Sequence, residues 1–124
     1  MMKKILPYLI MATITALPIT VRPNTSVGLQ EFSAERGKNL WNQKHTISGQ
    51  TRRCTSCHTG NPRQAGKHVR TGKMIKPMAP SVNSDRFVDH KKTAKWFKRN
   101  CKWTMGRECN EQEKGDLIRY LKSI

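Results

Sequence analysis

The pattern of apolar and polar positions predicts three helices, separated by one long irregular segment. The helices are expected over residues 27–43, 91–99 and from 110 or 111 to 122, because apolar side chains recur there at roughly helical spacing. Residues 58–86 are rich in Gly, Pro, Ser and Asn and are expected to form a loop. No segment shows a convincing strand pattern. The apolar members of the three helices are Leu29, Phe32, Leu40 and Trp41; Ala94, Trp96 and Phe97; and Leu117, Ile118 and Leu121.

Polar residues at the helix ends support these boundaries. Asp89 is a candidate N-cap for the second helix. In the third helix, acidic residues fill the early turns and Lys122 lies near the end, which complements the helix dipole. Gly37 interrupts the first helix, and a reason to retain glycine there is the close approach of another helix.

The N-terminal segment has the pattern of a secretory signal. Two lysines at positions 3 and 4 precede an apolar run over residues 5–16. The run is interrupted by proline and is shorter than the roughly 20 residues of a membrane span. We expect a signal peptide over residues 1–20, cleaved somewhere between 16 and 22, and a mature domain over 21–124. This predicts a periplasmic protein, or a membrane-anchored one if the signal stays uncleaved.

The chain is strongly basic, with 24 Lys and Arg against 8 Asp and Glu and a formal charge of +16. Removal of Lys3 and Lys4 with the signal leaves +14. Such a field attracts anionic partners and speeds their encounter. The sequence lacks a stacking motif or recognition-helix pattern for nucleic acid. We therefore expect an acidic redox protein as partner, with an anionic membrane surface as the second possibility.

The stretch Cys54-Thr55-Ser56-Cys57-His58 carries the most specific chemistry. Two thiols at this spacing can each form a thioether with a haem vinyl group, and the adjacent histidine can then ligate the iron. A chain this small and polar has little apolar surface for a core. A buried haem would supply part of what is missing, so the motif predicts one covalent haem c with His58 as its proximal ligand.

Two other uses of the cysteines compete with this interpretation. C-x-x-C also occurs in zinc sites and in redox dithiols. A zinc site would draw on all four cysteines of the chain, with or without His58. Export favours the haem interpretation, because c-type haem is attached outside the cytoplasm. Disulfides also persist there, so the two remaining cysteines can pair with each other. The four residues are Cys54, Cys57, Cys101 and Cys109.

The motif and its surroundings resemble the class I c-type cytochromes. Gly37-x-x-x-Trp41 and Tyr120 are similar to the glycine–aromatic crossing of the terminal helices in that family. The resemblance implies a small all-α fold packed around one covalent haem. More narrowly, the chain resembles the sphaeroides-haem-protein type. The segments that carry this resemblance are Thr71-Gly72-Lys73, Pro77-Met78-Ala79-Pro80-Ser81-Val82-Asn83, Trp96-Phe97, Asn100-Cys101 and Gly106-Arg107-Glu108-Cys109.

The resemblance implies an unusual sixth ligand. In that family the distal donor is the side-chain oxygen of an asparagine that directly precedes a disulfide cysteine, and the matching residue here is Asn100. A Cys101–Cys109 disulfide follows from the same resemblance. Met78 or Met105 could ligate instead, as thioethers do in ordinary electron-transfer cytochromes. Asn100 could also be no more than a helix C-cap. The remaining alternative is a sixth position that is vacant or filled by water.

An asparagine ligand implies a function. The amide oxygen is a hard, weak donor, so it should detach on reduction and open the iron to a diatomic gas such as O2 or NO. We therefore expect one-electron transfer with gas binding in the reduced state, and the family resemblance suggests a dihaem cytochrome as partner. The alternatives are a conventional Met-ligated electron shuttle and a small haem enzyme acting on NO or O2. The enzyme is disfavoured, because the distal region offers no evident acid–base residue. Arg70 and Lys73 are candidate partners for the haem propionates.

Overall fold

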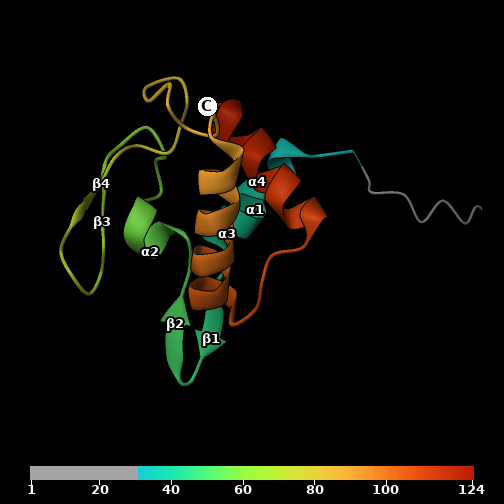
Figure 1. The fold of residues 1–124 in the computed structure, drawn as a ribbon. Coiled ribbons are helices and arrows are strands. Elements are labelled where there is room, and N and C mark those ends of the chain that lie inside the picture. The colour runs from blue at the N-terminus through green and yellow to red at the C-terminus, as the bar shows by residue number, and fades with distance from the viewer. Residues whose placement is uncertain (1–30) are drawn as a thin grey trace, which may run out of the picture.

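The computed structural model describes residues 31–124 and shows a small helical fold with two short β-hairpins (Figure 1). The all-α fold class is confirmed. The predicted signal peptide lies outside the described residues. The helices are α1 (Ala34–Asn42), α2 (Thr55–His58), α3 (His90–Met105) and α4 (Glu111–Lys122). The strands are β1 (His45–Ile47), β2 (Gln50–Arg52), β3 (Gly66–Lys67) and β4 (Met74–Ile75).

Helices α1 and α4 cross at Gly37, as the sequence predicts. A Cβ atom at this position would collide with the backbone carbonyl oxygen of Asp116 and lie 2.7 Å from Cβ of Tyr120. Overpacking of this kind forces backbone shifts. Glycine is therefore the residue that lets the two helices meet.

Polar contacts reinforce the crossing. Asp116 is buried and accepts hydrogen bonds from the backbone N–H of Ser33 at 2.7 Å and from Nε of Arg36 at 2.8 Å. The Ser33 hydroxyl in turn caps α1 by accepting from the backbone N–H of Arg36. The start of α1 is thus tied to the middle of α4 through one carboxylate.

The core lies at this crossing. Its buried members are Trp41 from α1 and Leu117, Tyr120 and Leu121 from α4. Partly buried residues from the rest of the chain pack against it: Leu40, Cys54, Met78, Phe87, Phe97 and Ile124. Because Cys54 is among them, the cysteine–histidine motif is packed directly against the core.

Helix α4 has the boundaries that the sequence predicts. Asn110 is its N-cap, and its side chain accepts from the backbone N–H of Glu113 while the Glu113 carboxylate accepts from the N–H of Asn110. This capping box satisfies two backbone donors that a helix start leaves unpaired. The signal is local, so the sequence alone could locate it.

Two other helices differ from the prediction. Helix α1 begins at Ala34, and residues 31–33 precede it in a non-helical conformation. Helix α3 continues past residue 99 to Met105 and ends at Gly106, whose φ of 75° is left-handed. Glycine adopts this conformation readily and commonly terminates helices. The alternative role of Asn100 as a C-cap is therefore wrong, because Asn100 lies inside α3.

The expectation that the chain contains no strands is also wrong. Strands β1 and β2 pair antiparallel around Ser48 and Gly49, both of which have positive φ. Their hairpin packs on the last turns of α3, where Arg52 Nη1 donates to the backbone carbonyl of Trp103 at 2.9 Å and the Arg52 guanidinium lies 4.9 Å from the centre of the Trp103 ring. Strands β3 and β4 form a second hairpin inside the predicted loop.

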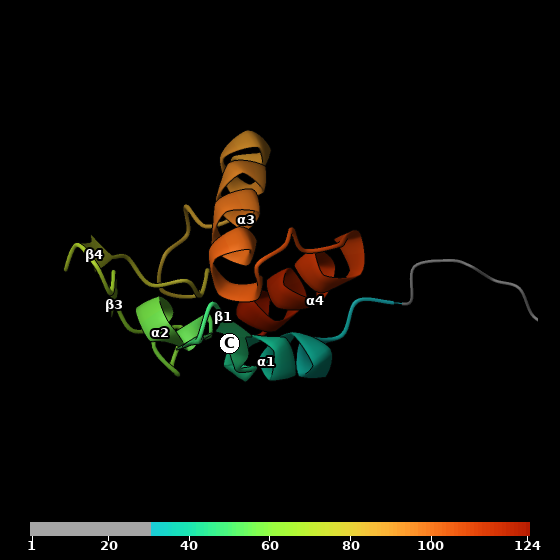
Figure 2. The same ribbon diagram turned by 90° about the horizontal axis from the view of Figure 1, so that it is seen from below.

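The elements divide into two groups on either side of α3. Figures 1 and 2 both show α4 on one side of α3, and α2 with the β3–β4 hairpin on the other. The cysteine–histidine motif lies in the second group. Among residues 31–124, no helix has the length and apolar character needed to cross a bilayer.

Candidate haem site

Helix α2 gathers the three residues of the motif on one helical turn. Cys54 is its N-cap, and the Cys54 carbonyl accepts from the backbone N–H of His58 at 3.1 Å. Cys57 and His58 follow Cys54 by three and four residues, and side chains at these spacings share one face of a helix. Both cysteines of α2 are free thiols. The turn therefore presents two thiols and an imidazole to the same side.

The surrounding chain holds this turn closely. The indole Nε1 of Trp41 donates to the backbone carbonyl of Thr59 at 3.2 Å, which ties the end of α2 to α1. Strand β3 passes on another side, where a Cβ at Gly66 would collide with the Cys57 carbonyl oxygen and lie 3.0 Å from Cα of His58. Only glycine allows so close an approach. The position of the motif is thus fixed by two segments that lie on either side of it in the sequence.

Burial sets the protonation state of the motif. Desolvation raises the pKa of the Cys54 thiol to about 11. It also lowers the pKa of His58 to about 4, with the positive charge of Arg86 as a second cause. His58 is therefore neutral at physiological pH, and the neutral imidazole is the form that ligates metals.

The residues present fit a haem c. Nδ1 of His58 is buried and has no hydrogen-bond partner within residues 31–124. The imidazole is neutral and no hydrogen bond from Nδ1 to the described residues is present, so a ring nitrogen is available to ligate iron. Cys54, Cys57 and His58 are the residues that would hold the group.

The Pro62 carbonyl is not a partner of His58, although a metal-bound histidine usually donates its other ring nitrogen to a nearby carbonyl or carboxylate. In the structure, the Pro62 carbonyl accepts instead from the backbone N–H groups of Met78 at 2.8 Å and Ala79 at 3.0 Å. The carbonyl thus anchors the loop that carries Met78.

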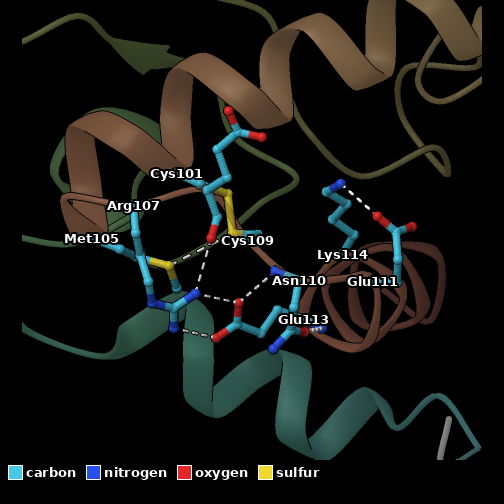
Figure 3. The surroundings of a disulfide bond; sticks show 9 residues. Cys101, Met105, Arg107, Cys109, Asn110, Glu111, Glu113 and Lys114 are labelled. Atoms are coloured by element: carbon cyan, nitrogen blue, oxygen red, sulfur yellow. Dashed lines mark hydrogen bonds and ion pairs between the residues drawn. A yellow bond between two sulfur atoms is a disulfide. The ribbon is translucent and has the colours of Figure 1, made fainter.

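Asn100 lies on α3, at the border between the buried and exposed faces of the helix. It is exposed, whereas Phe97, three residues earlier, is half-buried and Thr104, four residues later, is buried. Its neighbour Cys101 is buried and forms a disulfide with Cys109, with an S–S distance of 2.01 Å (Figure 3). The helix turn that carries Asn100 is therefore covalently tied to the segment that leads into α4.

The segment around the disulfide is further ordered by charged groups. Arg107 makes two hydrogen bonds to the Glu113 carboxylate, at 2.8 and 2.6 Å. This pairing keeps the pKa of Glu113 below its ordinary value, with the N–H of Asn110 contributing in the same direction. The carboxylate that caps α4 thus also holds the turn between the two cysteines.

The methionines occupy different surroundings. Met78 is half-buried and packs against the core residues of α1 and α4. Met105 lies at the end of α3 with its Sδ 3.6 Å from Sγ of Cys109, so its thioether contacts the disulfide (Figure 3). Met74, a further thioether donor of the loop, is on β4 and is 66% exposed. Among the three, Met78 is the one that packs against the core cluster.

The predicted propionate partners, Arg70 and Lys73, lie in the exposed turn between β3 and β4. Neither belongs to an ion pair within the described part of the chain. Arg86 is a cation that sequence reasoning did not single out. It is half-buried, donates from Nε to the Pro77 carbonyl at 2.8 Å, and acts on the pKa of His58. No local signal distinguishes it from the other basic residues, because its position depends on folding of the loop.

Comparison with known proteins identifies the family. A family model described as a domain of unknown function, DUF1924, matches residues 27–121. The chain belongs to the DUF1924 family. Its relatives include the cytochrome c-type protein SHP of Cereibacter sphaeroides, which is 44% identical over 89 residues, 71% of this chain and 68% of the relative.

A second relative is cytochrome c'' of Methylophilus methylotrophus, 44% identical over 86 residues. That alignment covers 68% of this chain and 60% of the relative, so this DUF1924 chain spans less than two thirds of cytochrome c''.

The disulfide between Cys101 and Cys109 leaves only the thiols of Cys54 and Cys57 free, which removes two of the four ligands of the alternative zinc site.

Solved structures agree with these matches. Oxidised SHP, described as an oxygen-binding cytochrome c, superposes with a TM-score of 0.70 at 40% identity, covering 75% of this chain and 83% of the other. Oxidised cytochrome c'' gives 0.68 at 42% identity, covering 74% and 76%. This member of the DUF1924 family is thus a homologue of c-type cytochromes, and that homology implies a covalent haem c.

Proposed function

We propose that this chain is an exported monohaem c-type cytochrome that transfers one electron at a time. Its distal ligand would leave on reduction and return on oxidation. The observation that carries the proposal is the placement of two free thiols and a neutral, half-buried imidazole on the single turn of α2. Homology to c-type cytochromes supports the same assignment. The sequence contains one C-x-x-C-H motif, so we propose one haem.

In this proposal Cys54 and Cys57 hold the haem through thioether bonds and His58 is the proximal ligand. When bound, haem supplies the one-electron couple and a site for a diatomic gas. The packing of Cys54 against the core, and of Trp41 against the His58 ring at a centroid distance of 5.5 Å, would orient the imidazole. Arg86, together with Arg70 and Lys73, would offer positive charge to the propionates.

We assign the distal position to the side-chain oxygen of Asn100. This assignment is supported by its place directly before the buried Cys101–Cys109 disulfide. SHP is described as an oxygen-binding cytochrome c. The solution structure of cytochrome c'' is described in terms of haem-ligand detachment. A neutral amide oxygen is a weak donor, so its bond should fail on reduction. Beside a bound haem, the Asn100 amide N–H would be available as a hydrogen-bond donor to a diatomic gas.

The disulfide would limit how far Asn100 moves. Cys101 is the next residue in the helix, and its partner lies only eight residues away. Closing a short loop covalently lowers the entropy that ordering the segment would otherwise cost. Asn100 would therefore remain close enough to rebind on oxidation.

The partner and compartment are part of the same proposal. The N-terminal signal pattern supports export to the periplasm, or attachment to the membrane if the signal is retained. The net positive charge supports an acidic redox partner, and a dihaem cytochrome is one candidate of that kind.

Paired absorption spectra of the purified haem protein test the ligand assignment. We expect the reduced form to change its spectrum when carbon monoxide is added, because the amide has left. Asn100→Ala should alter the oxidised spectrum and leave the carbon monoxide complex of the reduced form unchanged. The matched control is Met78→Leu, which should alter neither.

The opposite pattern would support the Met-ligated alternative. A reduced protein that does not react with carbon monoxide contradicts ligand release. A thioether-to-ferric charge-transfer band that disappears in Met78→Leu assigns the sixth ligand to Met78. Circular dichroism of both variants checks that each remains folded.

A further inference from the structure

The outer face of α3 carries an uninterrupted group of cations. With 3.6 residues per turn, its basic residues fall within a sector of about 120°. The half-buried Phe97 and the buried Cys101 and Thr104 occupy the opposite side of the helix. All six cations are exposed. They are Lys91, Lys92, Lys95, Lys98, Arg99 and Lys102, and we call them the cation face of α3.

This concentration of positive charge lowers the stability of α3. Like charges four residues apart, as at Lys91 and Lys95 or Lys95 and Arg99, repel each other. Lysines at the first turn also oppose the helix dipole. Within residues 31–124, the only acidic partner of the face is Glu108, at 3.7 Å from Lys98 and 3.2 Å from Lys102. The remaining four cations make no ion pair in the described part of the chain.

Helix α4 shows that the same chain can balance charge on a helix. Its first turn holds Glu111 and Glu113, its last turn holds Arg119 and Lys122, and Lys114 pairs with Glu111 at 2.7 Å. Helix α3 has no acidic residue in its first turn. The cation face is thus a property of α3 and not of the helices in general.

An exposed aromatic side chain borders the cation face. Trp96 is 44% exposed, and the Arg99 guanidinium carbon lies 5.1 Å from the centre of its ring. On the helix, Trp96 lies between the cation face and Asn100. Tryptophan and arginine are the residues most enriched at the energetic centres of protein interfaces. A tryptophan stacked with arginine and bordered by lysines combines an apolar anchor with a charged surround.

We infer that the cation face of α3, together with Trp96, is the docking surface for an acidic protein partner that exchanges electrons with this chain. The inference rests on the proposed function. Charge complementarity selects a partner whose surface is rich in carboxylates. A partner seated there would lie next to Asn100, the proposed distal ligand.

A protein surface fits this face better than a membrane does. Amphipathic helices that bind membranes bury a broad apolar face among the lipids. The apolar face of α3 is already packed against the core through Phe97 and closed by the Cys101 disulfide. Within α3, Trp96 is the one exposed large apolar side chain beside the cations, because Trp103 is half-buried under Arg52, and one such side chain is too little for insertion.

Matched charge-neutralised variants of the haem-loaded protein test the docking surface. The first variant is Lys92→Gln, Lys95→Gln and Arg99→Gln, which takes three unpaired cations from α3. The control is Arg63→Gln, Lys67→Gln and Lys76→Gln, three exposed cations before, within and after the β3–β4 hairpin. Both variants lose the same net charge. The probe is poly-L-glutamate of about 20 residues, titrated calorimetrically at about 20 mM salt, where surface charges are weakly screened.

We expect the α3 variant to weaken binding of poly-L-glutamate about tenfold and the control less than twofold. Equal losses in the two variants would show that only net charge matters and would overturn the inference. Phosphatidylglycerol vesicles are the second probe. Vesicle binding that survives about 1 M salt and is lost in the α3 variant would assign the face to a membrane and would also overturn it.

The result is separable from the proposed function. The α3 variant should keep the haem spectra and the carbon monoxide response of the unaltered protein, because none of the three substituted residues is a proposed ligand. Loss of acidic-peptide binding with unchanged spectra supports the docking surface. Unchanged binding with unchanged spectra overturns the docking surface and leaves the ligand assignment intact.

Discussion

The α1–α4 crossing and the α2–α3 side of the molecule differ in whether their buried polar groups have hydrogen-bond partners. At the crossing, Asp116 is buried but accepts hydrogen bonds from Ser33, Arg36 and Gln112. On the other side, His58 buries a ring nitrogen with no partner in the described residues, and Cys54 buries a free thiol. Buried polar groups in proteins are nearly always satisfied.

The difference shows where the polypeptide is complete on its own and where it is not. The crossing is satisfied by protein atoms alone. The residues of α2 are arranged for chemistry that the polypeptide does not contain, and a covalent haem would supply it. The predictions that follow test the independence of the two regions.

Gly37→Val should have the largest effect on stability. The new side chain would collide with the Asp116 carbonyl and Tyr120, and overpacking of this kind costs about 3 kcal/mol. Denaturant unfolding of the haem-loaded protein measures it. Gly60→Ala is the control, because a Cβ there meets nothing within 4 Å. Similar losses in the two variants would mean that the helices do not meet at Gly37.

Removal of the disulfide should come next. In the double variant Cys101→Ser, Cys109→Ser, the unfolded chain regains the entropy of a short loop, which corresponds to about 2.5 kcal/mol. Reduction of the unaltered protein should reproduce the loss in the same unfolding assay. If the bridge also restrains Asn100, the oxidised spectrum should change as well. A variant with unaltered stability and spectrum would contradict both roles.

Asp116→Asn should lower the free energy of unfolding at neutral pH by about 2 kcal/mol, since hydrogen bonds to a charged group are lost. The Arg36 side chain, followed by the N–H of Ser33 and the Gln112 amide, holds the pKa of Asp116 below its ordinary value. The stabilisation is therefore present above the unfolded-state pKa of about 3.9 and is lost as pH falls through the lower folded-state value.

The pH dependence of unfolding provides the check on that carboxylate. The unaltered protein should lose stability in acid more steeply than Asp116→Asn does. Parallel acid limbs in the two proteins would show that Asp116 titrates normally. Asp85→Asn, at an exposed position with no ion pair in residues 31–124, is the matched control.

Neutralising the start of α3 should have the smallest effect, of opposite sign. The double variant Lys91→Gln, Lys92→Gln removes charges that oppose the helix dipole and should raise the free energy of unfolding by about 0.5 kcal/mol. Lys122→Gln, in the last turn of α4, should lower it slightly. Thermal unfolding of both compares them. Destabilisation by the α3 variant would show that its lysines stabilise the fold.

The sequence predicts the crossing well because its signals are local or nearly so. Asn110 and Glu113 form a capping box three residues apart, and Gly37 stands out inside an otherwise helical pattern. Gly106 is a local signal for the end of α3, but no such signal marks the continuation of the helix past residue 99. It depends on the disulfide and on the β1–β2 hairpin, whose Arg52 reaches the Trp103 carbonyl across a large sequence separation.

The two hairpins and the position of Arg86 also could not be predicted from local sequence signals. Strands of two or three residues are too short to show alternation, although Ser48 and Gly49 are typical hairpin-turn residues. Arg86 is one of many basic residues in the sequence, and only the folded loop brings its charge close to His58. Long-range placement of this kind cannot be read from a periodic pattern.

Peptide mapping of the purified protein by mass spectrometry tests the central claim most directly. The account predicts that the peptide containing Cys54 and Cys57 carries haem, so that neither thiol is alkylated after denaturation, while Cys101 and Cys109 become alkylated only after reduction. Free, alkylated thiols at Cys54 and Cys57 and no haem on that peptide would contradict it.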